Sequence, residues 1–384
     1  MKRTEARLLC CVGTLLALGT VMVFSVISAR ATTLGVGTRY LAKGLIWVAI
    51  GVAGLAVMRR IDYRRLERYW WVVGLMGLTV LVAVLVPGVG TLKNGARRWI
   101  QFGPIGFQPS EFAKLAVLVT VCAMACRMGE RIRDVRRGLL PCMGVVAAAS
   151  ALIFLEPDFG TAALVGMMGT AVVLAAGAPL GPIAAAGGVG VGAVSVLIRH
   201  SPHRLARVFA FLNPWKYYDG AGYQVIHSLT SLGSGGIFGR GLGASRQKLF
   251  YLPESDTDFL FAIIGEELGL IGTVAVVFLF AVIVREGMRI SARAPDAFGA
   301  LLAYGLVLMI ALQAVIHMAV VTASMPTKGI ALPFVSAGGS SLLASMMGLG
   351  ILLNIASQAP APASREIQEI SRREEAEISA QPGL

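Results

Sequence analysis

The chain has 384 residues, of which 56% are hydrophobic and only 14% are charged, and its mean hydropathy is +0.74. Soluble globular domains carry roughly 25% charged residues, so this composition excludes a water-soluble enzyme, a disordered chain and a disulfide scaffold. The 34 Lys and Arg residues outnumber the 21 Asp and Glu residues, which gives a formal net charge of +13. The composition is that of a membrane protein with an excess of positive charge.

Long apolar runs predict ten transmembrane helices, because each crossing of a bilayer needs about 20 apolar residues. The runs lie at 8–28, 41–58, 69–87, 112–126, 139–155, 159–176, 180–198, 258–284, 298–321 and 340–357. We therefore expect an all-α polytopic membrane protein with about ten transmembrane helices. One transmembrane domain is predicted over 1–357, with a large outer loop, 199–257, between helices 7 and 8, followed by a polar cytoplasmic tail over 358–384.

The distribution of Lys and Arg predicts the orientation, since cytoplasmic loops are enriched in these residues. With the N-terminus inside, 19 of the 34 basic residues lie in the inner segments and tails, and both termini face the cytoplasm. The other 15 lie outside or at the outer boundary, where such residues are usually scarce. Long loops can escape the rule, so this excess is explained either by loop length or by an anionic ligand on the outer face.

Polar residues near the start of the fourth predicted helix form the first motif. Arg98 and Trp99 precede Gln108-Pro109-Ser110-Glu111, and Lys114 follows one turn inside the helix. Ser110 is placed to cap this helix. Lys114 either has a functional role within the membrane or extends back to the interface.

Carboxylates form two further motifs. Glu156-Pro157-Asp158 lies between two predicted spans, where a tight turn with a helix cap explains most of the pattern. Glu254, Asp256 and Asp258 converge on the start of the eighth predicted helix, and crowding near a low dielectric can raise the pKa of one carboxyl or demand a cation. Glu266 and Glu267 lie about 12 Å further along that helix, so they need a buried cation, for which Lys114 is the candidate.

Prolines, glycines and hydroxyls interrupt the apolar pattern between the ninth and tenth predicted helices, over 325–341. This segment contains Lys328, Ser340 and Ser341. Irregular backbone at membrane depth is tolerated only where it is buried or lines a cavity. Consecutive amides near Gly338 and Gly339, at a helix N-terminus, could bind a phosphate.

At these motifs the sequence resembles the SEDS family (shape, elongation, division and sporulation) of polytopic peptidoglycan glycosyltransferases. Further matching segments are Phe211-Leu212-Asn213-Pro214-Trp215 with Arg207 ahead of it, Gly222-Tyr223-Gln224 and Glu266-Glu267-Leu268-Gly269. The match runs from the first predicted span to the tenth. Pro326-Thr327-Lys328-Gly329 is similar to the division and sporulation branch (FtsW, SpoVE) rather than to the elongation branch (RodA).

The resemblance implies an enzyme of the bacterial cytoplasmic membrane that polymerises lipid II into β-1,4 glycan strands during cell division and releases undecaprenyl pyrophosphate. It places the essential carboxylate at Asp258, as general base or as ligand of a divalent cation, Mg²⁺ or Mn²⁺. Substrate-binding candidates are Arg98, Trp99, Gln108, Ser110, Lys114, Arg207, Glu254, Lys328, Ser340 and Ser341. Glu156, Asp158, Glu266 and Glu267 are expected as structural charges.

The expected partners are lipid II, a class B penicillin-binding protein that cross-links the product, and other membrane proteins of the division machinery. No nucleic acid partner is expected. Alternatives remain open: the buried charges would also suit a flippase for the lipid-linked precursor, the enzyme could be an elongation-branch polymerase, and a scaffold that recruits division proteins would need no catalytic Asp258.

Overall fold

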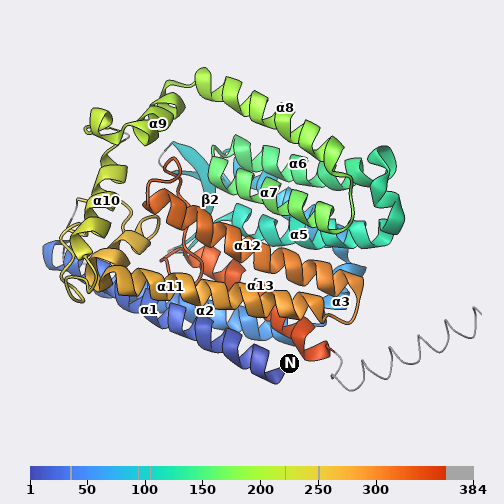
Figure 1. Cartoon of the computed structure of the whole chain (residues 1–384), viewed down its shortest axis with the longest axis horizontal. Helices are drawn as coiled ribbons and strands as arrows, with labels where there is room; N and C mark the ends of the chain where they lie inside the picture. The colour runs from blue at the N-terminus through green and yellow to red at the C-terminus, as the bar shows by residue number, and fades with distance from the viewer. Residues whose placement is uncertain (35–36, 94, 104, 221, 250, 360–384) are drawn as a thin grey trace, which may run out of the picture.

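Long apolar segments fold as helices in a bilayer because a helix satisfies the backbone N–H and C=O groups within the segment itself. The computed structural model describes residues 1–359 except 35–36, 94, 104, 221 and 250. Figure 1 shows most helices running alongside one another as a bundle. The polar tail predicted over 358–384 lies outside the described residues from 360 onward.

Each of the ten predicted apolar runs coincides with a helix. These helices are α1 (Lys2–Leu34), α2 (Gly37–Arg60), α4 (Trp70–Leu85), α5 (Pro109–Met128), α6 (Leu140–Leu155), α7 (Phe159–Ala175), α8 (Leu180–Arg199), α11 (Leu260–Ala292), α12 (Ala297–Val321) and α13 (Gly339–Gln358). In the described part of the chain, seven helices are long and apolar enough to cross a membrane by length and composition, whereas α4, α7 and α8 are shorter apolar helices. The count of ten crossings therefore stays a prediction.

The centre of the bundle is formed by α5, α12 and α13. More than half of the apolar window of each is buried inside the protein, against 11% for α2. α13 packs against α2, and α11 packs against α1, α10 and α12. Buried side chains are therefore concentrated on three central helices, and the other helices shield them from lipid.

A small antiparallel sheet corrects the all-α prediction. Strands β1 (Gly90–Lys93), β2 (Ala96–Phe102) and β3 (Ile105–Phe107) lie in order in the segment expected as an outer connection, with Ile100 opposite Phe107. Gly95 and Gly103 have positive φ angles at the two turns, which glycine adopts without steric cost. The sheet packs on α4, α5 and α13 and thereby fixes Arg98 and Trp99 over one end of the bundle.

The predicted outer loop, 199–257, contains ordered helical structure. It includes α9 (Pro202–Leu212), the short helix η3 (Pro214–Tyr217) and α10 (Tyr223–Gly235). α10 packs against α11 and buries His227, Ser228 and Ser231. The polar and glycine-rich composition of this segment concealed the helix, because its buried face is lined by small hydroxyl side chains.

The start of the first helix, α1, and the end of the last helix, α13, lie at the same end of the bundle. Arg59 at the end of α2 donates a hydrogen bond to Glu5 of α1 over 3.0 Å. Arg64, in the short helix α3 (Tyr63–Arg68), donates to Gln358 at the end of α13 over 2.6 Å. The connecting turns η1 (Gly129–Arg133) and η2 (Val135–Leu139) complete the helical elements. The start of α1 and the end of α13 therefore share one end, as the predicted topology requires.

Candidate functional site

Asp258 lies in the turn that leads into α11. Its backbone N–H donates to the carbonyl of Glu254 over 3.0 Å, and Phe259 and Leu260, directly after it, are buried. Its half-buried carboxylate faces Gly329, where a Cβ atom would lie 2.8 Å from Oδ2 of Asp258. Glycine at 329 thus leaves room for the carboxylate.

Hydrogen bonds join the irregular segment 322–338 to the turn that carries Asp258. The N–H of Ala337 donates to the carbonyl of Asp256 over 3.0 Å, and the hydroxyl of Ser336 donates to the carbonyl of Thr257 over 2.7 Å. Ser336 also accepts from the N–H of Leu332 over 3.0 Å. These bonds satisfy buried backbone groups at the end of the bundle where α11 begins, and they set the position of Gly329 relative to Asp258.

The electrostatics of this turn bring the pKa of Asp258 close to neutral pH. Burial first, and then the negative charges of Glu254, Asp256 and Asp158, raise the pKa of Asp258 to about 7, and the positive charge of Arg98 limits the rise. A pKa close to the working pH is suited to a general base, because the group is then both available and able to accept a proton. The sequence predicts that crowding among Glu254, Asp256 and Asp258 raises the pKa of one of them, and Glu254 and Asp256 do raise the pKa of Asp258.

Arg98 fixes the Glu156-Pro157-Asp158 turn. Its Nε donates to the carbonyl of Glu156 over 2.9 Å, and a second guanidinium nitrogen donates to the carbonyl of Pro157. Asp158 caps α7 by accepting from the N–H and the hydroxyl of Thr161 over 3.1 and 3.0 Å. The predicted turn with a helix cap is confirmed.

Glu156 is fully buried, and neither of its carboxyl oxygens has a hydrogen-bond partner among the described residues. Burial first, and then the negative charge of Asp158, raise the pKa of Glu156 to about 8, and the positive charge of Arg98 limits the rise. Glu156 is consequently largely protonated at neutral pH. Its burial agrees with a structural role, but a neutral carboxyl differs from the structural charge that the sequence predicts.

Gln108 and the start of α13 form an adjacent polar cluster. The N–H of Gln108 donates to the hydroxyl of Ser340 over 3.0 Å, and its side-chain amide lies 3.2 Å from Ser110 Oγ and 3.4 Å from Asp158 Oδ2. The capping role predicted for Ser110 is wrong, because α5 begins at Pro109 and Ser110 lies inside its first turn. α13 begins at Gly339 as expected, and a Cβ there would collide with the ring of Trp47, so Trp47 covers that side of the helix end.

Lys114 is buried among polar partners inside the bundle, which corrects two expectations. Its side chain is only 2% exposed, so it does not extend to the interface. Its Nζ lies 2.8 Å from Glu111 Oε2 and donates to Gln313 over 2.9 Å. Gln313 in turn donates to Ser341 and to the carbonyl of Ala331, each over 2.9 Å. Lys114 therefore pairs with Glu111 rather than with the expected Glu266 and Glu267.

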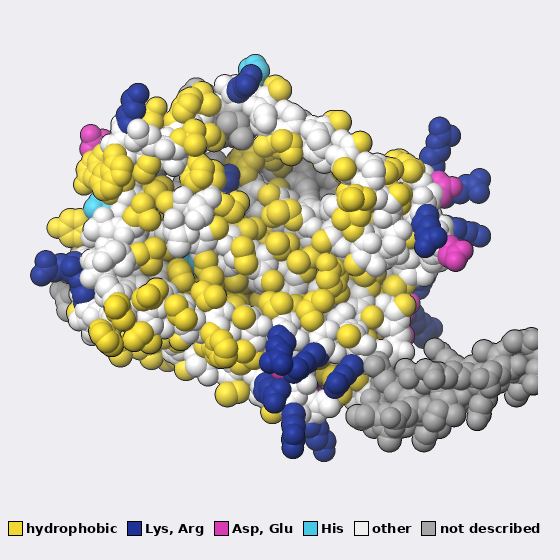
Figure 2. Space-filling view, in the orientation of Figure 1, with side chains coloured by type: hydrophobic (Ala, Val, Ile, Leu, Met, Phe, Trp, Pro, Cys, Tyr) yellow, Lys and Arg dark blue, Asp and Glu magenta, His cyan; other side chains and the backbone are white. Residues whose placement is uncertain are grey.

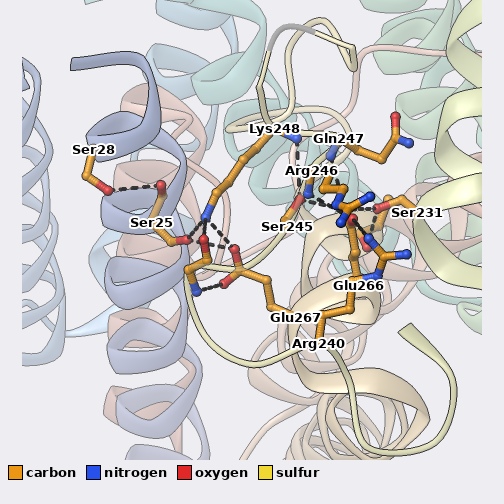
Figure 3. Close-up of polar contacts among 12 residues, drawn as sticks. Ser25, Ser28, Ser231, Arg240, Ser245, Arg246, Gln247, Lys248, Glu266 and Glu267 are labelled. Carbon is orange, nitrogen blue, oxygen red and sulfur yellow. Dashed lines mark hydrogen bonds and ion pairs between the residues drawn. The ribbon is translucent and has the colours of Figure 1, made fainter. Parts of the chain in front are cut away.

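Glu266 and Glu267 are instead neutralised by the glycine-rich segment that follows α10 (Figure 3). Lys248 Nζ donates to Glu267 Oε1, to Ser25 of α1 and to the carbonyl of Gly243, each over 2.7 Å. Glu266 accepts from Ser245 Oγ over 2.5 Å and from the N–H of Arg246 over 2.9 Å. Sequence reasoning missed Lys248, although it is one of the basic residues in the predicted outer loop.

α11 is interrupted at Gly269, which has a φ of 68°. Segment 236–241 fills the break: the N–H of Leu270 donates to the carbonyl of Gly236 over 2.9 Å, and the N–H of Gly241 donates to the carbonyl of Glu267 over 3.0 Å. A Cβ at Gly239 or Gly269 would collide with the facing backbone. The glycine run therefore serves close approach between two stretches of backbone.

The other candidate residues lie further from Asp258 or flank it. Lys328 adjoins Gly329, and its Nζ lies 5.0 Å from the centre of the Phe159 ring. Trp99 is half-buried on β2, and a Cβ at Gly106 would lie 3.3 Å from its ring. Glu254 is exposed, and Arg207 is exposed on α9. The charges of Arg98, Asp158 and Glu254 act on Asp258, so these four side chains lie close together. Lys114 and Ser341 belong to the network around Gln313, and Arg207 lies on α9.

The described residues contain no group of three or more His, Cys, Asp and Glu side chains placed to hold a metal ion. Mg²⁺ usually keeps several waters and binds one or two carboxylates together with substrate phosphates. Asp258 suits such a limited role as a carboxylate ligand. The described residues alone do not form a site that surrounds a cation with protein ligands.

Comparison with known sequences shows the family. The family model described as "Cell cycle protein", which covers FtsW, RodA and SpoVE, matches residues 6–360. The chain is 43% identical over 351 residues to the probable peptidoglycan glycosyltransferase FtsW of Trichlorobacter lovleyi, covering 91% of this chain and 92% of the relative. It is 40% identical over 359 residues to the stage V sporulation protein E of Bacillus subtilis, covering 92% and 98%.

Solved structures with the same fold support this assignment. One is a chain from a peptidoglycan synthase complex that coordinates polymerization and crosslinking, with a TM-score of 0.73, 26% identity and coverage of 91% of this chain and 96% of that chain. Another is the rod shape determining protein RodA of Thermus thermophilus, with a TM-score of 0.68, 26% identity and coverage of 92% and 97%. The chain therefore belongs to the SEDS family, is FtsW/SpoVE-like, and is a multi-pass protein of the bacterial cytoplasmic membrane.

Proposed function

We propose that the chain is a peptidoglycan glycosyltransferase that polymerises lipid II into β-1,4 glycan strands during cell division. The observation that carries this proposal is the carboxylate of Asp258, whose pKa burial raises to about 7, facing Gly329 at one membrane end of the bundle. The name of the FtsW relative and the resemblance to a chain of a peptidoglycan synthase complex support the same activity.

The proposed orientation places Asp258 at the outer face. The end of the bundle that holds the start of α1 and the end of α13 then faces the cytoplasm, and all ten apolar helices cross the membrane. The domain of residues 1–357 is the catalytic unit, and 358–384 is a cytoplasmic tail. Under this arrangement the lipid tails of the substrate stay in the bilayer while its sugars meet Asp258.

Asp258 acts as general base in the proposed mechanism. Its ionised carboxylate accepts the proton of the acceptor's 4-hydroxyl as that oxygen forms a bond to the anomeric carbon of the donor. The bond from that carbon to the pyrophosphate breaks on the opposite side, which inverts the anomeric centre and releases undecaprenyl pyrophosphate.

The leaving pyrophosphate needs positive charge, which Arg and Lys supply through charge-assisted hydrogen bonds. Arg98 and Lys328 flank Asp258, and Arg207 lies on α9 as a further contact. Gln108, Trp99 and Glu254 are proposed as neutral and acidic contacts to the sugars. Ser110 and Ser340 are buried and are proposed to act through Gln108, which donates to their hydroxyls. Lys114 and Ser341 support the substrate region from within the bundle. If Asp258 is instead a metal ligand, Mg²⁺ or Mn²⁺ would be held by its carboxylate and the substrate phosphates and would neutralise developing negative charge.

A class B penicillin-binding protein is the proposed partner, together with other membrane proteins of the division machinery. The structural relative from a complex that coordinates polymerization and crosslinking supports this pairing. Cross-linking of the product then occurs on a separate chain.

Polymerisation of purified lipid II by the full chain with its partner tests the proposal. Asp258→Ala is expected to abolish polymer while thermal unfolding in detergent stays close to that of the wild type. Asp219→Ala, which removes an exposed carboxylate from the same predicted outer segment, is the matched control and should polymerise normally. An unchanged polymer yield from Asp258→Ala would refute the assignment.

The alternative of a lipid II flippase loses much of its motivation. The buried charges that suggested it lie in two separate local clusters, Lys114 beside Glu111 and Lys248 beside Glu267. Movement of labelled lipid II across liposomes containing the chain, without formation of polymer, would favour the flippase.

A further inference from the structure

Five basic side chains surround a cavity of about 490 Å³ at the end of the bundle away from Asp258. They are Lys2, Arg3 and Arg7 at the start of α1 and Arg289 and Arg293 at the end of α11. The membrane-spanning stretches of these helices are Lys2–Ser28 and Leu260–Ala292, so the cavity lies where both helices meet the membrane boundary. Figure 2 shows Lys and Arg side chains gathered beside the start of α1 and next to an apolar surface.

One buried carboxylate holds two of these cations in place. Glu286 is 1% exposed, and its Oε1 accepts from Arg7 over 3.2 Å and from Arg289 over 2.6 Å. Each guanidinium has five N–H donors, so both retain donors for another acceptor. Their side chains remain 56% and 38% exposed. Glu286 therefore holds Arg7 and Arg289 in place, but its single negative charge does not neutralise the five basic side chains of the cavity.

The remaining cations of the cavity have no carboxylate partner among the described residues. Within the described part of the chain, Lys2, Arg3 and Arg293 have no carboxylate within ion-pair distance, whereas the nearby Glu5 pairs with Arg59. The first turn of α1 adds free backbone N–H groups and the positive end of the helix dipole. The cavity thus holds an excess of positive charge and of hydrogen-bond donors.

The surface next to the cavity is apolar. Leu9 of α1 and Met288 of α11 are exposed apolar side chains close to it, and further exposed apolar side chains continue along both helices. Basic pockets between transmembrane helices at the cytoplasmic side suit the headgroups of anionic lipids. We propose that this cavity binds the phosphodiester headgroup of an anionic phospholipid, with its acyl chains in the surrounding bilayer.

A bound headgroup would bridge the ends of α1 and α11. The same two helices are joined nearer the catalytic end, where Ser25 of α1 contacts Lys248 and Glu267. The lipid therefore stabilises the pairing of α1 with the helix that begins directly after Asp258.

Native mass spectrometry of the delipidated full chain tests the proposal by titration with phosphatidylglycerol, cardiolipin and phosphatidylcholine. The wild type should bind the two anionic lipids and not phosphatidylcholine. The triple variant Lys2→Gln, Arg3→Gln, Arg293→Gln leaves Arg7, Arg289 and Glu286 intact. Each basic residue near a membrane surface contributes about 1 kcal/mol, and 1.4 kcal/mol is a factor of ten, so we expect affinity to fall about 100-fold.

The matched control is Arg60→Gln, Arg65→Gln, Arg133→Gln, which removes three exposed arginines from the same end of the bundle but none from the cavity. Its affinity should change less than threefold, because none of these three side chains lines the cavity. An equal loss in both variants would show general attraction to the surface and overturn the proposal. Binding of glycerol 3-phosphate as tight as that of phosphatidylglycerol would indicate a soluble phosphate ligand and also overturn it. The assay measures no polymer, so its result is independent of the glycosyltransferase assignment.

Discussion

Lys248 Nζ lies 2.7 Å from Glu267 Oε1, and both side chains are almost fully buried, 4% and 0% exposed. The pair links the segment after α10 to the N-terminal part of α11, and Ser25 of α1 donates to the same carboxylate oxygen over 2.8 Å. Removing one partner of a buried pair is far more costly than removing both, because it leaves an uncompensated charge.

Lys248→Met should therefore destabilise the protein by about 3–5 kcal/mol. The double variant Lys248→Met, Glu267→Gln should recover a large part of this loss, which thermal unfolding in detergent measures. Arg240→Gln is a useful comparison, because Arg240 is partly exposed and 3.8 Å from Glu266, so its loss should cost less than 1 kcal/mol. Equal losses for Lys248→Met and Arg240→Gln would contradict the role given to the buried pair.

Polymerisation should depend on pH through Asp258. With a pKa of about 7, raised chiefly by burial, the ionised base increases about tenfold between pH 6 and pH 8, and kcat/KM should rise in proportion. Glu254→Gln removes a neighbouring negative charge that raises the pKa of Asp258, so it should move the inflection to lower pH. A profile that stays flat in wild type, or an inflection that moves upward in Glu254→Gln, would count against Asp258 as the base.

Gly329→Ala should impair catalysis more than folding. The added Cβ would lie 2.8 Å from Oδ2 of Asp258, so the carboxylate has to shift, and a displacement of about 1 Å can cost a factor of about 100 in rate. Gly144→Ala in α6 is the control, since a Cβ there has open space and alanine favours the helix. Lipid II polymerisation and thermal unfolding should be compared for both. Normal activity of Gly329→Ala would exclude tight placement of the carboxylate.

Gly269→Ala should disrupt the break in α11. Gly269 has a positive φ, and a Cβ there would collide with the backbone of Gly239. Gly236→Ala also places alanine at a positive φ, but a Cβ there has no neighbour within 4 Å, so it should cost only about 1–2 kcal/mol. The difference between the two variants in yield and unfolding temperature measures the close approach of the backbones. Similar yields and unfolding temperatures for Gly269→Ala and Gly236→Ala would mean that the backbone around Gly269 can shift to accept a Cβ at little cost in stability.

The positions of the helices could be predicted from the sequence, but the pairing of their charges could not. Apolar runs located ten helices because a span must be apolar throughout, and Asp158 was correctly expected to cap a helix. The predicted pairing of Lys114 with Glu266 and Glu267 is wrong, although Glu111, three residues before Lys114, has the regular i, i+3 spacing of a helical ion pair. Lys248 lies 19 residues before Glu267 in an irregular segment, and such a pair, formed by tertiary packing, leaves no regular spacing in the sequence.

The small sheet and α10 escaped prediction for related reasons. The strands are short and depend on packing against α4, α5 and α13, so their periodicity is weak. α10 buries serines and a histidine, which read as a polar loop until Ser231 is seen to donate to Glu266 and Ser228 to the carbonyl of Val321. Gly329 lay within a recognised motif, and its role emerged only from its distance to Asp258.

The partners of Glu266 and Glu267 have a consequence for how the protein is made. Every contact named for these two carboxylates comes from residues earlier in the chain, from Ser25 of α1 to Lys248. A carboxylate at the centre of a membrane helix costs about 2.5–3.5 kcal/mol on insertion. Synthesis from the N-terminus supplies each neutralising group before the ribosome reaches α11, so this helix can enter the bilayer with its charges already matched.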